Sequence, residues 1–182
     1  GFSSLLDNFG RLENKGFELV INGKPIQNKN FNWSVTGIFN HNRNKAVKIG
    51  QALTLLSTNS GSPVAIIEGQ PIGIFYGAFF AVDPNGNPLK TTAGFIQGER
   101  GTQTGALTYI EKRDPTTGLP IATFPLLRKI IGDPNPDYTA SLVNEFTYKK
   151  ASLRVQFDAV QGNEVFNADW RTRQGVGNGK EA

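Results

Sequence analysis

The chain has 182 residues, of which 38% are hydrophobic and 19% are charged, and its formal net charge is +4. Both fractions are low for a compact soluble domain, and 21 glycines with 10 prolines favour a turn-rich β protein over a helical one. The chain has no cysteine, which excludes a disulfide framework, a cysteine zinc site and a cysteine nucleophile. Lysines and arginines are scattered along the chain, so we expect no nucleic acid partner.

The sequence opens at Gly1 in what reads as mid-sequence, and it contains no methionine. No apolar run is long enough for a membrane helix. We therefore expect a fragment of a longer protein, for which a missing signal peptide says nothing about export.

Four segments alternate apolar and polar residues with a period of two, which is typical of strands with two different faces. They are residues 16–23, 30–42, 137–149 and 151–162. The apolar faces carry aromatic residues near the strand ends, including Trp33 and Phe39 in the second segment and Tyr138 and Phe146 in the third. Aromatic residues at both ends of a strand mark the two water interfaces of a membrane barrel.

The connections between these strands are alternately short and long. Residues 23–30 and the pair Lys149 and Lys150 predict two hairpins. A long insert separates the second strand from the third. It contains two Asp-Pro turns with a later glycine, at 83–88 and 114–120, so we expect small hairpins inside it. This alternation is typical of outer-membrane barrels, which have short turns on one side and long loops on the other.

The pattern leaves two folds open. In a soluble antiparallel β-sandwich, which would suit a carbohydrate-binding or adhesin module, the apolar faces would pack into a closed core. In an outer-membrane barrel they would face lipid, and the polar faces would line a wet lumen. The polar residues that we expect in that lumen are Glu145, Arg154, Gln156 and Asp158.

Three stretches resemble the SusC/RagA-like TonB-dependent outer-membrane transporters of Bacteroidetes. They are residues 11–49 (RLENKGFELVINGKPIQNKNFNWSVTGIFNHNRNKAVKI), residues 68–88 (EGQPIGIFYGAFFAVDPNGNP) and residues 130–167 (IIGDPNPDYTASLVNEFTYKKASLRVQFDAVQGNEVFN). They follow the family's order and cover most of residues 10–168. Members of the family often carry an acidic stretch suggestive of a calcium loop before the last motif, and residues 111–129 replace it here. Glu111 and Asp114 alone do not make a carboxylate cage, so we expect no metal.

The resemblance implies an all-β fragment, with the antiparallel strands of a partial outer-membrane β-barrel and a long extracellular loop insert containing small hairpins. Residues 1–42 would hold two barrel strands, residues 43–136 the long extracellular loop, residues 137–162 two further strands, and residues 163–182 the start of the next extracellular loop. The whole protein would import oligosaccharides or other large nutrients across the outer membrane of a Gram-negative cell. Its partners would be a SusD-like surface lipoprotein, TonB through a missing N-terminal part, a glycan or peptide ligand, and outer-membrane lipid.

Nothing in the sequence resembles an active site, so we expect no enzyme and no cofactor. A β-rich hydrolase is a third alternative, but no pair of carboxylates is placed to converge on one bond. The single histidine, His41, lies in a polar strand end.

The aromatic residues of the insert have two interpretations. They form the insert's own small core, or one or two exposed rings stack on a sugar or pack against a lipoprotein lid. With an aromatic residue of the C-terminal tail, the candidates for ligand or lid contact are Phe75, Tyr76, Phe79, Phe80 and Trp170.

The segment before the third strand is predicted to join the long loop to the barrel. It comprises Asp133, Pro134, Pro136, Asp137 and Tyr138. The prolines restrict the backbone and remove two amide donors. The aspartates can bind nearby amides, and the tyrosine suits a membrane interface, with its ring toward lipid and its hydroxyl toward water.

Overall fold

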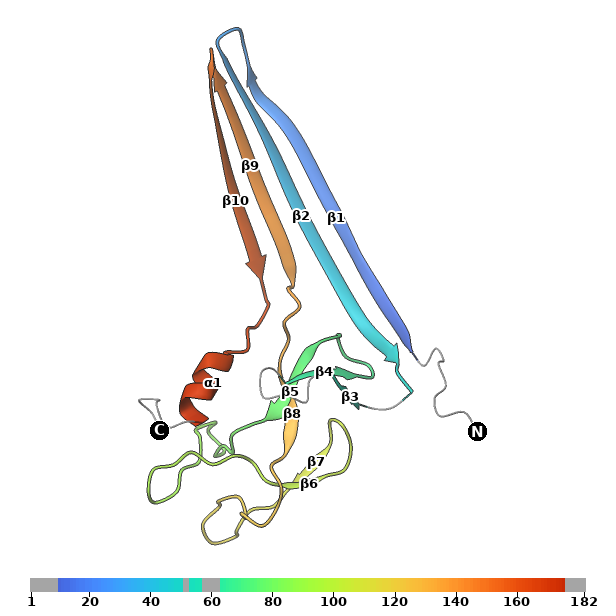
Figure 1. Ribbon diagram of the computed structural model, residues 1–182, viewed down its shortest axis with the longest axis vertical. Coiled ribbons are helices and arrows are strands. Elements are labelled where there is room, and N and C mark those ends of the chain that lie inside the picture. Colours follow the sequence, from blue (N-terminus) through green and yellow to red (C-terminus); the bar gives the residue numbers. More distant parts are fainter. Residues whose placement is uncertain (1–9, 51–52, 57–62, 176–182) are drawn as a thin grey trace. The chain divides into compact units, whose positions relative to one another are not determined.

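The computed structural model describes residues 10–50, 53–56 and 63–175, apart from the side chains of residues 170, 171, 174 and 175. The chain forms two compact units (Figure 1). The unit that we call the sheet unit comprises residues 13–44 and 135–164. The insert unit comprises residues 1–12, 45–134 and 165–182.

The sheet unit is built on four long antiparallel strands, β1 (Arg11–Gln27), β2 (Phe31–Lys48), β9 (Tyr138–Tyr148) and β10 (Ala151–Gln161). Their order in the sheet is β1-β2-β9-β10, so the hairpin formed by the first two strands pairs with the hairpin formed by the last two (Figure 1). The four strands predicted from the alternating pattern are all present. The described residues thus have the all-β, antiparallel fold that the sequence predicts, with one short helix.

The register of the sheet places the apolar residues of neighbouring strands on one face. Four positions of this face in β2 are paired with four in β9: Phe31 with Tyr148, Trp33 with Phe146, Gly37 with Leu142, and Phe39 with Ala140. The same residues of β9 are paired on their other side with β10: Tyr148 with Ala151, Phe146 with Leu153, Leu142 with Phe157, and Ala140 with Ala159. Because side chains alternate along each strand, the residues between these positions form the opposite, polar face. Slipping one strand by one residue would exchange its two faces.

Two short turns close the hairpins at the same end of the sheet. The Asn28 side-chain oxygen accepts hydrogen bonds from the amides of Asn30 (3.1 Å) and Phe31 (2.8 Å). Lys149 has a φ of 54°, the left-handed conformation that two-residue hairpin turns use. Its amide donates to the carbonyl of Asn30 at 2.9 Å, so the two turns are tied to each other.

The insert unit contains a second antiparallel sheet with the strand order β3-β4-β5-β8. Its strands are β3 (Leu53–Leu55), β4 (Val64–Ile67), β5 (Ile74–Ala78) and β8 (Arg128–Gly132). The short strands β6 (Gly101–Gln103) and β7 (Tyr109–Glu111) pair with each other, and the helix α1 (Ala168–Gly175) follows later in the chain. Ala65, Ile67, Ile74 and Tyr76 form the core of this unit. Among the described residues, no helix has the length and apolar content needed to cross a membrane.

Both Asp-Pro turns of the insert form the small hairpins that the sequence predicts. The carboxylate of Asp83 accepts hydrogen bonds from the amides of Asn85 (2.8 Å) and Asn87 (2.9 Å). The carboxylate of Asp114 likewise binds the amides of Thr116 (2.8 Å) and Thr117 (2.9 Å). Hydrogen bonds from Asn87 lower the pKa of Asp83, and hydrogen bonds from Thr117 and Thr116 lower that of Asp114. The turns are therefore stabilised by charged caps.

A buried ion pair joins these two hairpin regions. Glu99 is 1% exposed, and its carboxylate binds the guanidinium of Arg113, including an Nε to Oε1 contact of 3.3 Å. Arg113 also donates to the carbonyl of Val82 at 3.1 Å. The hydrogen bond with Glu99 raises the pKa of Arg113. Val82 precedes the first Asp-Pro turn, Glu99 follows it, and Arg113 directly precedes the second. The contacts of Arg113 with Val82 and Glu99 therefore connect the two turns.

Candidate functional site

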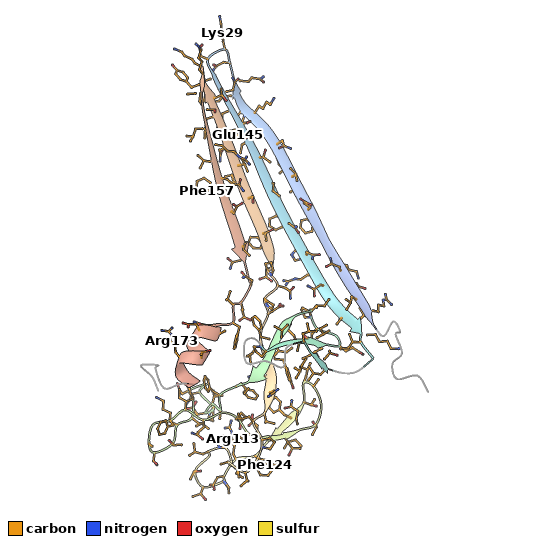
Figure 2. All side chains as sticks on the ribbon, viewed as in Figure 1. Lys29, Arg113, Phe124, Glu145, Phe157 and Arg173 are labelled. Atoms are coloured by element: carbon orange, nitrogen blue, oxygen red, sulfur yellow. The ribbon has the colours of Figure 1, made fainter. Side chains whose placement is uncertain are left out.

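The apolar face of the sheet unit is exposed. The exposed fraction is 63% for Phe157 and 44% for Leu142, and Phe17 and Leu153 are exposed as well. Figure 2 shows side chains along the whole length of the sheet, with Phe157 labelled on β10. Within the described part of the sheet unit, no second layer covers this face. The closed core that a soluble sandwich requires is therefore missing from this unit.

An aromatic cluster borders the apolar face near the two short turns. The ring of Phe146 stacks on those of Trp33 (5.8 Å between centroids) and Phe31 (6.4 Å). The indole Nε1 of Trp33 donates to the side-chain oxygen of Asn144 at 3.2 Å. Tyr148 ends β9 beside this cluster. We call the four aromatic residues the turn-end cluster.

A second aromatic cluster borders the apolar face at its other end. Phe39 stacks on Phe17 (5.7 Å) and on Tyr138 (5.3 Å), and the ring of His41 lies 5.7 Å from that of Phe17. We call these four residues the loop-end cluster. At a rise of about 3.4 Å per residue, the interval from Phe146 to Tyr138 spans roughly 27 Å along β9, which corresponds to a height of about 21 Å at the roughly 40° tilt of barrel strands. The apolar band of an outer-membrane barrel has a height of about 25 Å between its aromatic girdles.

The four residues predicted to face the lumen share the polar face of the sheet. Glu145 and Arg154 lie opposite each other, with 3.8 Å between Oε1 and Nε. The hydroxyl of Ser34 donates to Glu145 at 3.3 Å. Gln156 donates to the carboxylate of Asp158 at 3.0 Å. The structure brings these residues together as a polar network, and their position in a lumen stays a prediction.

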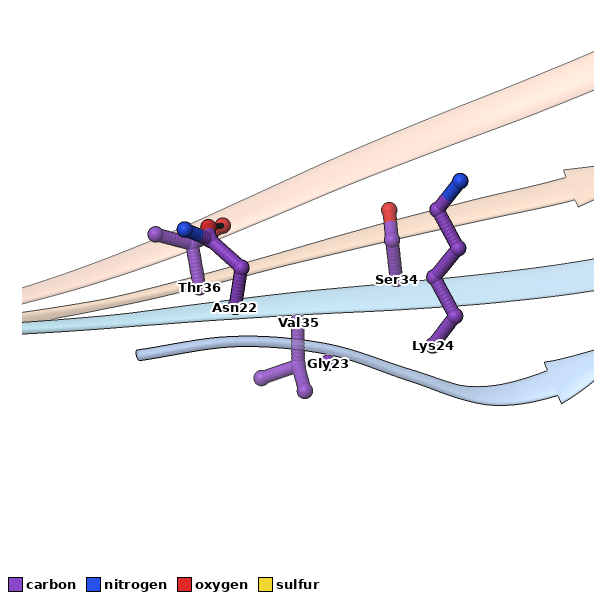
Figure 3. Close-up of a pocket in the computed structure, with 6 residues that line it drawn as sticks. All are labelled: Asn22, Gly23, Lys24, Ser34, Val35 and Thr36. Atoms are coloured by element: carbon purple, nitrogen blue, oxygen red, sulfur yellow. Dashed lines mark hydrogen bonds between the residues drawn. The ribbon is translucent and has the colours of Figure 1, made fainter. Parts of the chain in front are cut away.

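The polar face is hollowed near the turns. A pocket of about 350 Å³ is lined by Asn22, Gly23, Lys24, Ser34, Val35 and Thr36. In Figure 3, Asn22, Lys24, Ser34 and Thr36 project to one side of β1 and β2, and Val35 projects to the other. Thr36 donates to the side-chain oxygen of Asn22 at 2.8 Å. The lining offers hydrogen-bond donors and acceptors to water or to a polar ligand.

Asp137 connects three segments at the loop end of the sheet unit. Its carboxylate pairs with Arg43 of β2, and its amide donates to the carbonyl of Gln161 at 2.7 Å. Nδ1 of His41 lies 2.6 Å from the carbonyl oxygen of Asp137 and donates to it. A Cβ at Gly162 would clash with Oδ2 of Asp137. The segment predicted to join loop and barrel is therefore fastened to β2 and β10 through Asp137.

The other predicted joint residues lie on both sides of the boundary between the units. Asp133 and Pro134 belong to the insert unit, and Pro136 and Tyr138 belong to the sheet unit. Tyr138 begins β9 and packs in the loop-end cluster. Its ring is thus on the apolar face, and its position at a membrane interface stays a prediction.

The candidate aromatic residues of the insert occupy different environments. Phe75 and Tyr76 are buried in β5, where the Tyr76 hydroxyl accepts a hydrogen bond from Gln103 at 3.1 Å. Burial raises the pKa of the Tyr76 hydroxyl, and the charge of Arg128 opposes this shift. Phe79 packs on Tyr109, with Lys129 Nζ 4.3 Å from its ring centroid. Phe80 is 54% exposed.

Two of these candidates therefore belong to a core, and Phe80 offers a ring to the surface. Trp170 falls in α1, but its side chain lies outside the described residues. Contact with a ligand or a lid stays a prediction for this set. The part of the chain that the structure describes contains no group of three or more His, Cys, Asp or Glu side chains that could hold a metal ion.

Sequence reasoning missed three contributors to this site. Asn144 interrupts the apolar face of β9, and the interruption in the alternating pattern was the available signal. Arg43 and Gly162 act through Asp137, which lies far from both in sequence. No local pattern predicts such contacts, because the register between β2, β9 and β10 creates them.

Comparisons with known proteins agree with this geometry. No family model matches the chain. The chain is 34% identical over 174 residues to TonB-dependent receptor P3 of Formosa agariphila, an alignment that covers 92% of this chain and 17% of that receptor. It is 29% identical over 177 residues to TonB-dependent receptor P26 of the same organism, again over 17% of the relative. The chain therefore spans a small part of the relatives that it matches, and both of these relatives are named as TonB-dependent receptors.

Solved structures share the fold. The structure of the RagAB peptide transporter matches with a TM-score of 0.54 and 23% identity, covering 86% of this chain and 16% of that chain. The RagAB peptide importer in its open-open state matches with a TM-score of 0.53 and 21% identity, over 88% of this chain and 16% of that one. The four strands of the sheet unit do not close a barrel by themselves. By sequence, this chain is similar to one segment of TonB-dependent receptors, and by fold it is similar to one segment of the RagAB transporter.

Proposed function

We propose that this chain is a segment of an importer in the outer membrane of a Gram-negative cell, which takes up oligosaccharides or other large nutrients. The observation that carries the proposal is the exposed apolar face of the sheet unit, bordered by an aromatic cluster at each end and backed by a polar face. In a membrane barrel, the apolar face would contact the hydrocarbon of the bilayer, and the polar face would be hydrated by water in the lumen. The protein would act by gated transport, with no bond chemistry.

The orientation follows from the lengths of the connections. The two short turns face the periplasm, since outer-membrane barrels have short turns on that side. Residues 43–136 then form an extracellular loop, and residues 163–182 begin the next one. Asp133, Pro134, Pro136, Asp137 and Tyr138 join the long loop to the barrel, and Glu145, Arg154, Gln156 and Asp158 line the lumen.

The partners follow from homology to TonB-dependent receptors. TonB would drive uptake through a part of the receptor outside this segment, and a SusD-like surface lipoprotein would cover the extracellular side. Among the aromatic residues predicted from the sequence for contact with this lid or with a ligand, Phe80 has an exposed ring and is therefore our candidate. The ligand is a glycan or a peptide, and RagAB, which shares the fold, is a peptide transporter.

Growth on defined nutrients tests the proposal. A strain without the parent gene would be grown on oligosaccharides or on peptides as the limiting nutrient, with and without functional TonB. We expect growth to fall on one nutrient class, and loss of TonB to cause the same defect. Complementation with wild-type protein should restore growth, and Phe80→Ala should restore less than the control Phe95→Ala, which changes another exposed ring. Unchanged uptake of both nutrient classes, or absence of the receptor from the outer-membrane fraction, would overturn the proposal.

A further inference from the structure

The turn end of the sheet unit carries three exposed lysines. Lys29 lies in the turn between β1 and β2, and Lys149 and Lys150 form the turn between β9 and β10. Figure 2 shows Lys29 projecting away from the tip of the sheet. The hydrogen bond from the Lys149 amide to the Asn30 carbonyl holds the two turns together. Three positive charges are therefore kept at one end of the sheet.

Two cations near the loop end of the sheet have carboxylate partners. At the loop end, Arg43 pairs with Asp137, and Lys15 Nζ lies 2.6 Å from a carboxylate oxygen of Glu13. At the turn end, none of the three lysines pairs with a carboxylate of the described residues. Like charges that are held together without a counter-charge create a positive potential that attracts anions.

The surroundings of these lysines indicate which kind of anion they bind. Lys149 Nζ lies 5.3 Å from the ring centroid of Tyr148, a member of the turn-end cluster. Aromatic girdles sit at the level of the lipid headgroups, and lysine stems extend along apolar surface while their ammonium groups reach the polar layer. The Lys149 ammonium thus lies at the Tyr148 ring, and Lys29 and Lys150 belong to the same pair of turns.

We propose that Lys29, Lys149 and Lys150 bind the phosphate of anionic phospholipids in the leaflet faced by the short turns. The proposal rests on the proposed function, which places the apolar face in a bilayer. Each lysine near an anionic membrane surface adds roughly fivefold to the affinity. The chemistry is shared by free phosphate and by the phosphates of lipid A, so the test separates these sources.

The test uses the full receptor that contains this segment, purified in a neutral detergent. Native mass spectrometry measures its affinity for phosphatidylglycerol, with phosphatidylcholine as the neutral lipid. The triple variant Lys29→Gln, Lys149→Gln and Lys150→Gln should lose on the order of 100-fold in affinity for phosphatidylglycerol. The triple arginine variant keeps the charges and should keep the affinity.

A matched control removes three other exposed lysines, Lys45, Lys48 and Lys90, each changed to Gln. This control should bind phosphatidylglycerol like the wild type. Equal affinity of the wild type and the turn variant would overturn the proposal. Competition by inorganic phosphate at the same concentration would show a free-anion site, and tighter binding of lipid A than of phosphatidylglycerol would show that lipid A is the source of the phosphate. Either result would also overturn it.

Nutrient uptake by the same variants separates this proposal from the proposed function. If the turn variant binds phosphatidylglycerol normally while uptake is TonB-dependent, the lipid site is refuted and the importer stands. If the wild-type receptor does not take up either nutrient class, the importer fails whatever the lipid affinity is.

Discussion

At the scale of single residues, Gly162 has a conformation and a neighbour that together exclude a side chain. Its φ is +85°, which residues with a Cβ rarely adopt, and a Cβ there would meet the Asp137 carboxylate. The same carboxylate pairs with Arg43. Glycine at this position therefore lets the end of β10 approach the residue that fastens the joint to β2.

We expect Gly162→Ala to loosen the loop end of the sheet unit. The strained backbone and the displaced carboxylate should lower the free energy of local opening by about 1–3 kcal/mol. Hydrogen–deuterium exchange of the full receptor would show faster exchange at the amides of Asp137 and Tyr138. Gly37→Ala is the control, because nothing lies within 4 Å of a Cβ added there. Equal protection in wild type and Gly162→Ala would contradict the role assigned to Gly162.

At the scale of elements, one buried charged pair helps to hold the hairpins of the insert unit together. Glu99 is buried, whereas Glu111, the second carboxylate near Arg113, is 45% exposed and lies 3.5 Å from it. Removing one partner of a buried pair leaves the other charge without compensation. Removing an exposed carboxylate has a small effect, because water replaces it.

We expect Glu99→Ala to open the insert, with a loss of about 1–3 kcal/mol in local stability, because Arg113 loses its buried partner and keeps only the exposed carboxylate of Glu111. Limited proteolysis of the receptor should then cut within residues 79–127 much faster. Glu111→Ala removes a carboxylate from the same arginine, and its expected cost is about 0.2–1 kcal/mol. Similar cleavage rates for the two variants would show that burial of Glu99 does not matter for the stability of the insert.

At the scale of the whole molecule, a lysine introduced on one face of the sheet unit should affect folding in the membrane differently from a lysine introduced on the other face. Phe157 and Gln156 are neighbours in β10 and lie on opposite faces. A lysine at the centre of a lipid-facing surface costs about 2–4 kcal/mol in an outer-membrane barrel, whereas a lysine in the lumen is solvated.

We therefore expect Phe157→Lys to reduce the folded receptor in the outer membrane severalfold, and Gln156→Lys to leave it nearly unchanged. Heat-dependent mobility on gels and outer-membrane fractionation would measure the folded amount. Equal yields of the two variants would contradict the lipid-facing assignment of Phe157.

Much of the sheet could be predicted from the sequence, because its signals are local. Alternation of side chains determines which residues share a face, so Trp33, Phe39 and Phe146 could be assigned to one face before any pairing was known. Turn chemistry is local as well, and it predicted the hairpins at Asp83 and Asp114.

The ends of the strands were less predictable. β2 continues to Lys48, beyond the expected end at residue 42. The fully buried Ala46 exchanges hydrogen bonds with the backbone of Gly69 and Gln70, at 2.7 and 2.9 Å. A polar run such as NHNRNK has no strand signal of its own, and its extended conformation depends on partners distant in sequence.

By itself, the sequence determined the strands, their two faces, the turns and the resemblance to a transporter family, because each of these depends on residues close together in the chain. Only the tertiary structure decided that Asp137 meets Arg43, that Glu99 is buried against Arg113, and that Phe75 and Tyr76 belong to a core. These contacts depend on register and on burial, which arise when distant segments pair. The grouping of Lys29 with Lys149 and Lys150 at one end of the sheet has the same origin, since the pairing of β2 with β9 brings their turns together.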